Sequence, residues 1–257
     1  GNSERLIGSS GNTRLPSYTK PQSEGLTPEN LRSRVKNSLH NLGVESLEGL
    51  TFHSPTPLLS NTKQFEIAIA ELVSEGLIRS WGVSVYEPSE ALVVANIPTL
   101  NYIQAPASVF DQRFLDPRLL GTLESFGVGI QLRSIFLQGL LLDEAVRLPK
   151  SLAALGPKLE DFGLFCKSIG SSREEVAVAF VAASAPSADL VLGVNSIDHL
   201  KSLAALNLPA MESIRELSNF KGISRELTDP RSAPAPDHHR RARARSTHAV
   251  GARPRRP

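Results

Sequence analysis

The chain has 257 residues, of which 40% are hydrophobic and 21% are charged, values typical of soluble globular proteins. Its single cysteine, Cys166, excludes an internal disulfide and fits a reducing compartment, and no stretch approaches the ~18 consecutive apolar residues of a membrane span. We therefore expect a soluble, cytoplasmic protein with no membrane partner, built as one large α/β domain or two smaller ones.

The C-terminal segment 229–257, called the tail below, differs in composition from the rest. Eight arginines against Asp229 and Asp237 give it a charge of +6, and because the whole chain carries +2, residues 1–228 carry about −4. With almost no apolar residue to bury, this Arg- and Pro-rich tail is expected to be disordered after a folded domain at 1–228. A basic arm can bind nucleic acid, but the tail lacks interleaved aromatic residues, so nucleic acid is a subordinate hypothesis.

Strand-like and helix-like patterns alternate along the chain from Leu15 to Leu206. Strands are expected at residues 15–19, 50–53, 78–85, 100–105, 128–135 and 190–194. Helices are expected at residues 3–7, 27–42, 65–73, 88–95, 119–126, 174–183 and 197–206, with a long insert at 138–170. Strands that alternate with helices favour a parallel α/β sheet.

The helix at 27–42 has start and stop signals. Thr27 can cap it, Pro28 occupies the first helical position, where its missing N–H costs nothing, and Gly43 ends it. Apolar residues recur between them at three- and four-residue steps and predict one buried face: Leu31, Val35, Leu39 and Leu42.

Polar residues stand at the carboxyl end of one predicted strand after another: Lys20, His53, Ser84, Gln104, Arg133–Ser134 and Asn195–Ser196. Every strand of a parallel barrel ends at the same rim, and barrel enzymes place their active sites there. The sequence contains no nucleotide-binding glycine fingerprint, phosphate loop or nucleophile elbow. Six predicted strands are two fewer than the eight that close such a barrel.

His53 is the most informative of these residues. It lies on the face opposite to Leu50 and Phe52, because side chains alternate along a strand, and Pro55 ends the strand because proline lacks a backbone donor. A lone histidine at a strand end is more often packed or solvated than functional. The polar residues expected at the other strand ends of the same rim make a functional role for His53 the better hypothesis.

Three motifs together resemble the aldo-keto reductase family, over residues 1 to about 206. The first is Ser-Leu-His-Asn-Leu-Gly at 38–43, followed by a strand that ends in His-Ser-Pro at 53–55. The second is Glu-Gly-Leu-Ile-Arg-Ser-Trp-Gly-Val-Ser at 75–84, and the third is Gln104 followed by the segment 133–139. The wider stretch 132–142 is similar to that of bacterial members linked to sugar or polysaccharide metabolism.

The resemblance implies a parallel (β/α)8 TIM-type barrel and an NAD(P)-dependent oxidoreductase that reduces an aldehyde, ketone or sugar carbonyl by hydride transfer. His53 matches the histidine that orients the carbonyl, and Lys20 matches the lysine that lowers the pKa of a catalytic tyrosine. Ser84 and Gln104 match groups that hold the cofactor carboxamide. The resemblance implies further cofactor contacts at Arg133 (in place of an aromatic residue), Ser134, Phe136, Gly139, Gly193, Asn195 and Ser196.

The family's catalytic tyrosine and its lysine-paired aspartate have no counterpart in this sequence. The tyrosine usually precedes Gly-Asn-Ser-Glu, and the chain begins with that motif at 1–4. We therefore expect a barrel that lacks roughly its first two strands and turns over poorly without its proton donor. With its edges open, such a chain is expected to be prone to aggregate or to depend on a partner. Tyr18 shares a face with Lys20 but lies two residues deeper, so we do not assign it as the acid.

Two other hypotheses stay open. One is a non-catalytic barrel, acting as a regulatory or scaffolding subunit or representing a degenerate gene product; the other is nucleic-acid binding through the tail. The spacing of His, Cys and carboxylate residues predicts no metal site. The sequence leaves open the substrate, the choice between NAD and NADP, and the oligomeric state.

Overall fold

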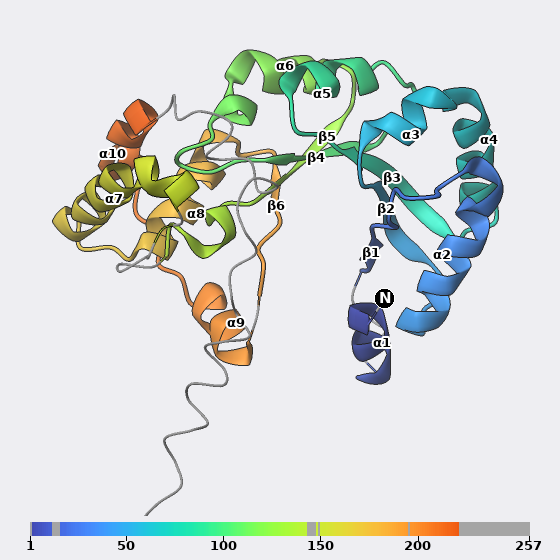
Figure 1. The fold of residues 1–257 in the computed structure, drawn as a ribbon, viewed down its shortest axis with the longest axis horizontal. Helices are drawn as coiled ribbons and strands as arrows, with labels where there is room; N and C mark the ends of the chain where they lie inside the picture. The colour runs from blue at the N-terminus through green and yellow to red at the C-terminus, as the bar shows by residue number, and fades with distance from the viewer. Residues whose placement is uncertain (1, 12–15, 143–147, 149, 195, 221–257) are drawn as a thin grey trace, which may run out of the picture.

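The computed structural model describes residues 2–11, 16–142, 148, 150–194 and 196–220. In this part of the chain, six parallel strands form one sheet whose spatial order is their order in the sequence. The sheet curls like the wall of a barrel (Figure 1), as expected when each crossover returns to the neighbouring strand with the same hand. The strands are β1 (Tyr18–Thr19), β2 (Leu47–Phe52), β3 (Ile78–Ser84), β4 (Tyr102–Pro106), β5 (Gly129–Arg133) and β6 (Asp189–Leu190).

Helices occupy most of the connections, and those between β1 and β5 lie on the outer side of the curled sheet (Figure 1). The α-helices are α1 (Asn2–Ser9), α2 (Pro28–Leu42), α3 (Pro55–Ser60), α4 (Thr62–Ser74), α5 (Pro88–Val94), α6 (Pro117–Ser125), α7 (Gly156–Ser168), α8 (Arg173–Ser184), α9 (Ile197–Ala204) and α10 (Met211–Ile214). Short 3-10 turns are η1 (Arg113–Leu115), η2 (Leu137–Gly139), η3 (Lys150–Leu155) and η4 (Arg215–Phe220).

The order and type of the predicted elements are confirmed, but several boundaries were wrong. The last strand was expected at 190–194 and is only Asp189–Leu190, because it pairs with β5 through two residues alone. The strands expected at 78–85 and 128–135 end earlier, at Ser84 and Arg133, and α3 was not expected. Part of the first predicted strand, residue 15 included, lies outside the described residues.

The predicted insert at 138–170 contains a helix that the sequence analysis missed. Helix α7 buries Leu159, Phe162 and Cys166, which recur at three- and four-residue steps. Gly156 and Gly163 lower its helix propensity, and this obscured a pattern that was present in the sequence. The connection between β5 and α8 is therefore a packed helical segment.

The hydrophobic core lies between the outer face of the sheet and the helices. Leu50 and Phe52 of β2 are fully buried there, and the Phe52 ring meets Phe65 of α4 edge to face, with 5.2 Å between ring centroids. Trp81 of β3 packs against Phe52 in the same way, at 5.9 Å. Burying a side chain of this size contributes roughly 1.5–3 kcal/mol. The outer face therefore supplies much of the stability.

The inner face of the same strands carries small and polar side chains. The Tyr102 hydroxyl lies 2.8 Å from Thr51 Oγ1, and its ring covers the backbone of β3. A Cβ added to Gly82 would lie 2.4 Å from this ring, and one added to Gly49 would lie 2.3 Å from the ring of Tyr18. Glycine is therefore needed where the tyrosines cross the strands, and the buried Tyr102 fills the interior below the rim, while Tyr18 on the edge strand is about half exposed.

Within the described residues, β1 and β6 each pair with a strand on one side only. Figure 1 shows them at the two edges of the curled sheet. None of the described helices is long and apolar enough to cross a membrane. The predicted tail at 229–257 lies outside the described residues, together with residues 221–228 of the predicted domain.

Candidate active site

Five of the predicted site residues lie at the carboxyl ends of adjacent strands. Lys20 follows β1 and His53 follows β2, while Ser84, Gln104 and Arg133 belong to β3, β4 and β5. Ser84 pairs in register with Gln104, and Gln104 pairs with Gln131, so these three side chains lie at one level of the inner face. The parallel sheet thereby gathers at one rim residues that are far apart in the sequence.

A chain of side-chain hydrogen bonds links Lys20 to two glutamines. Lys20 Nζ donates to Gln104 Oε1 at 2.9 Å, and Gln104 Nε2 donates to Gln131 Oε1 at 3.2 Å. Because an ammonium group has only donors, its contact assigns the oxygen of the Gln104 amide to Lys20 and the nitrogen to Gln131. The Gln104 amide on β4 therefore links Lys20, which follows β1, to Gln131 on β5.

Gln131 was not predicted as a site residue. It is buried, at 7% exposure, on the same face of β5 as Arg133 and two residues before it. The sequence feature that could have indicated Gln131 is a glutamine among the apolar residues of a central strand, because a buried polar side chain needs a hydrogen-bond partner.

Burial and neighbouring positive charges lower the pKa values of Lys20 and His53, which favours the neutral forms of both side chains. Burial lowers the pKa of Lys20 to about 8, and the positive charge of Arg133 acts in the same sense. Burial also lowers the pKa of His53 from its ordinary value of 6.5; the charges of Lys20 and Arg133 add to this, against a backbone hydrogen bond that raises it. The His53 imidazole is therefore neutral at pH 7.

Ser84 is fully buried, and its Oγ makes no hydrogen bond to any described residue. A buried hydroxyl without a hydrogen-bond partner lowers the stability of the fold by about 1–3 kcal/mol, and a binding site for a ligand is one reason to retain such a group. An amide group of a ligand bound over the rim ends of β3 and β4 would supply the missing partner. The hydroxyl and the neighbouring Gln104 amide therefore fit a carboxamide.

Arg133 ends β5 with its guanidinium over the ring of Tyr86, 4.5 Å from the centroid. Its Nη1 also donates to Ser134 Oγ at 3.1 Å. A guanidinium stacked on an aromatic ring is held as a flat, oriented cation. These contacts hold the positive charge of Arg133 in place at the end of β5, where Nε and Nη2 are buried.

The loop after β5 contains unusual backbone conformations. Ser134, Leu137 and Gln138 have positive φ angles of 65°, 46° and 56°, which non-glycine residues rarely adopt. Strain of this kind is concentrated at ligand-binding sites, because the surrounding structure must hold it in place. The predicted residues Phe136 and Gly139 belong to this loop, and Phe136 is buried, so its ring is not exposed to a ligand at the rim.

The remaining predicted residues follow β6. Gly193 lies three residues beyond the end of that strand, where an added Cβ would meet no atom within 4 Å, and Asn195 lies outside the described residues. Ser196 caps α9, where its Oγ accepts a hydrogen bond from the His199 backbone N–H at 3.0 Å. This capping role accounts for Ser196 without a ligand.

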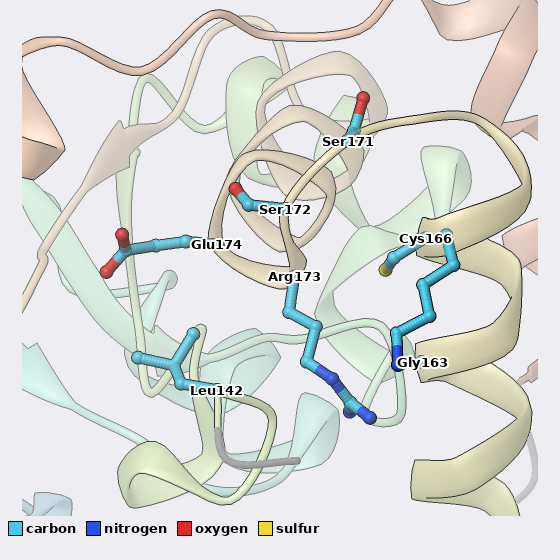
Figure 2. A pocket seen from close by; sticks show the side chains of 8 residues that line it. Leu142, Gly163, Cys166, Ser171, Ser172, Arg173 and Glu174 are labelled. Atoms are coloured by element: carbon cyan, nitrogen blue, oxygen red, sulfur yellow. The ribbon is translucent and has the colours of Figure 1, made fainter.

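A cavity of about 320 Å³ lies elsewhere, between α7 and the start of α8 (Figure 2). None of its lining residues is a predicted cofactor or catalytic residue. Burial raises the pKa of its one thiol, Cys166, to about 11, so the sulfur stays protonated and unreactive at neutral pH. Among the described residues there is also no group of three His, Cys, Asp or Glu side chains that could hold a metal ion.

Comparisons with known proteins agree with the fold. A model of the aldo/keto reductase family matches residues 9–217. The chain is similar to the NADH-specific methylglyoxal reductase of Escherichia coli K12, with 29% identity over 126 residues. That match spans 48% of this chain but only 38% of the reductase, so well under half of this curated relative is covered.

Two solved structures show the same architecture at low sequence identity. One is the holo form of an aldo-keto reductase from Bacillus halodurans, with a TM-score of 0.69 and 20% identity, covering 92% of this chain and 80% of that one. The other is a glycerol dehydrogenase from Gluconobacter oxydans, with a TM-score of 0.64 and 19% identity, covering 89% and 78%. At these identities the similarity establishes a TIM-barrel-like α/β fold.

Proposed function

The chain belongs to the aldo/keto reductase family, and on that premise we propose that it is an NAD(P)-dependent oxidoreductase acting on an aldehyde, ketone or sugar carbonyl. The observation that supports this most directly is the rim itself. Lys20, His53, Ser84 and Gln104 come from four successive strands and lie at the same end of the sheet. The reduced nicotinamide, when bound, supplies the hydride, and the residues of the chain position the carbonyl that receives it.

His53 is proposed to orient the carbonyl. Its lowered pKa keeps the imidazole neutral at pH 7, so one ring nitrogen carries a hydrogen and the other does not. The N–H donates a hydrogen bond to the carbonyl oxygen, where negative charge develops during reduction. A neutral imidazole performs this task without releasing a proton into the site.

Lys20 is proposed to stabilise the group that protonates the developing alkoxide. In this family that group is a tyrosine beside the lysine, and the chain offers Tyr18 and Tyr102 on the inner face. Burial raises the pKa of Tyr18, with added contributions from the charges of Glu48 and Asp189, and burial likewise raises the pKa of Tyr102. Neither phenol is tuned as an acid for neutral pH, so we propose that residues 1–257 turn over slowly.

Ser84 and Gln104 are proposed to hold the cofactor carboxamide. The buried Ser84 hydroxyl gains its missing partner, while the Gln104 amide must exchange a bond to Lys20 or Gln131 for one to the ligand. The strained loop at 134–139 is proposed to contact the pyrophosphate through its backbone. Gly193, Asn195 and Ser196 are proposed to contact the adenosine half of the cofactor. The folded domain at 1–228 and the tail at 229–257 are likewise kept as proposals.

Fluorescence titration of NADPH and NADH, followed by reduction of a reactive aldehyde, tests both halves of the proposal. We expect saturable binding and slow turnover. The variant S84A should weaken cofactor binding, whereas S125A, at the exposed end of α6, should not. Absence of saturable binding would refute the cofactor site and favour a non-catalytic barrel; rapid turnover would contradict the slow turnover proposed here.

A further inference from the structure

The ammonium group of Lys20 crosses the concave side of the curled sheet. Lys20 follows β1, yet its Nζ donates to Gln104 Oε1 on β4 at 2.9 Å, and the strands β2 and β3 lie between these two in the sheet. His53 follows β2 at the same rim, and the charge of Lys20 acts on it. A carbonyl that His53 orients therefore lies in the field of this ammonium group.

Lys20 keeps donors that a bound group can use. An ammonium group has three N–H donors and no acceptor, and the neutral amide of Gln104 is the acceptor that the described residues provide. No described carboxylate forms an ion pair with Lys20, and its side chain is only partly buried. Two N–H bonds of a partly accessible cation are therefore left for a ligand.

The other polar groups on this face of the sheet are unsuited to releasing a proton at neutral pH. Burial raises the pKa values of the phenols Tyr18 and Tyr102, so both hold their protons more firmly than an ordinary tyrosine. His53 has a lowered pKa and is already neutral at pH 7, and the guanidinium of Arg133 does not titrate in this range. Among these groups, Lys20 is the cation that can lose a proton and regain it.

The charge around Lys20 leaves it protonated at pH 7 but able to act as an acid. Burial lowers its pKa to about 8, and the positive charge of Arg133, at the end of β5, acts in the same sense. From the other strands it is faced by His53, which is neutral at pH 7, and by the amides of Gln104 and Gln131, which do not titrate. A general acid is most effective when its pKa lies near the operating pH.

We propose that Lys20 is itself the general acid of residues 1–257, and that Gln104 positions its ammonium group. This inference rests on the proposed function, because it assigns the proton donor of the same reaction. As the hydride adds to the carbonyl carbon, the C=O π electrons move onto the oxygen. One N–H bond of Lys20 then breaks, its electron pair stays on the nitrogen, and the proton forms the O–H bond of the alcohol. Water returns a proton to the amine, and the two-electron reduction of the carbonyl is balanced by oxidation of the hydride donor.

The first measurement follows the proton of Lys20 and needs neither cofactor nor turnover. In the full chain labelled with carbon-13 at the lysine ε-carbons, the NMR signal of Lys20 is assigned by its absence in K20M. This signal should titrate near pH 8, well below the ordinary lysine value of 10.5. A titration near 10.5 would overturn the inference, because such an amine is a poor acid at neutral pH.

The second measurement is the reduction of 4-nitrobenzaldehyde by the full chain with NADPH or NADH between pH 7 and pH 10. We expect kcat to be level up to about pH 8 and to fall about tenfold per pH unit above it, in step with the NMR titration. The variant K20R keeps the positive charge but cannot release a proton, so it should lower kcat by about 100-fold or more. K63R, on the exposed surface of α4, is the matched control and should keep kcat.

The outcomes separate this inference from the proposed function. If the wild-type chain oxidises NAD(P)H and K20R does so at a similar rate, or if kcat stays level to pH 10, the proposed function stands and the inference is wrong. If the wild-type chain neither binds nor oxidises NAD(P)H, both are wrong. A fall in kcat that coincides with the titration of Lys20 supports the inference even if K20R disturbs the fold, because it is measured on the wild-type chain.

Discussion

The two faces of the same sheet are built from different chemistry. On β2, Leu50 and Phe52 point outward into a dry core, and Thr51 points inward to the hydroxyl of Tyr102. Alternate residues of one strand therefore serve stability and the site separately. The comparison implies that substitutions on the outer face change the free energy of unfolding, whereas those at the inner rim change binding and titration.

The largest expected effect is on the outer face. F52A removes a fully buried ring that packs against Phe65 and Trp81, and should lower the free energy of unfolding by about 3–5 kcal/mol. Denaturant unfolding followed by circular dichroism measures it. F126A, at a half-exposed position after α6, is the matched control and should cost under about 1 kcal/mol. Similar losses for both would contradict the location of the core.

The inner face below the rim should resist added volume. G49A places a Cβ 2.3 Å from the Tyr18 ring and 2.7 Å from the Tyr102 hydroxyl, and should cost about 1–3 kcal/mol. Because both close neighbours of this site are side chains, trimming them should relieve the clash. In a double-mutant cycle the cost of G49A should fall in a Y18A background; an unchanged cost would show that the backbone at Gly49, rather than the tyrosine, sets the limit.

The titration of Lys20 gives a prediction of intermediate size. Its pKa falls to about 8 in the folded protein from 10.5, so the unfolded chain binds more protons between these values and stability should rise with pH across that window. The rise should be on the order of 1–2 kcal/mol. Denaturant unfolding at pH 7.5 and pH 10 measures this rise in the free energy of unfolding. The variant K20M lacks the titrating group and should not show the rise, whereas K167M, the control, should show it. Equal pH slopes for wild type and K20M would contradict the burial of this ammonium.

The smallest effect on stability is expected at Ser84. S84A removes a buried hydroxyl that has no partner among the described residues, so the free energy of unfolding should change by less than about 0.5 kcal/mol or even increase. Cofactor affinity, measured by NADPH fluorescence, should nevertheless fall severalfold. A large loss of stability in S84A would mean that the hydroxyl already has a structural partner.

Much of the site was predictable because parallel strands end at one rim. Once Lys20, His53, Ser84, Gln104 and Arg133 were placed at strand ends, their proximity followed from the sheet without knowledge of any contact. Their roles stay predictions. Gln131 and Tyr86 escaped the sequence analysis because each matters through one side-chain contact, to Gln104 and to Arg133, that no spacing in the sequence indicates.

The amino-acid sequence by itself determined the order of strands and helices, the parallel sheet and the set of polar rim residues, because these depend on short-range periodicity and on turn residues. Only the tertiary structure decided which amide end of Gln104 meets Lys20, which aromatic ring holds Arg133 and that the connection between β5 and α8 is helical. Those features depend on contacts between residues distant in sequence. Local patterns do not encode such contacts, since distance in space is set by the packing of the whole sheet and its helices.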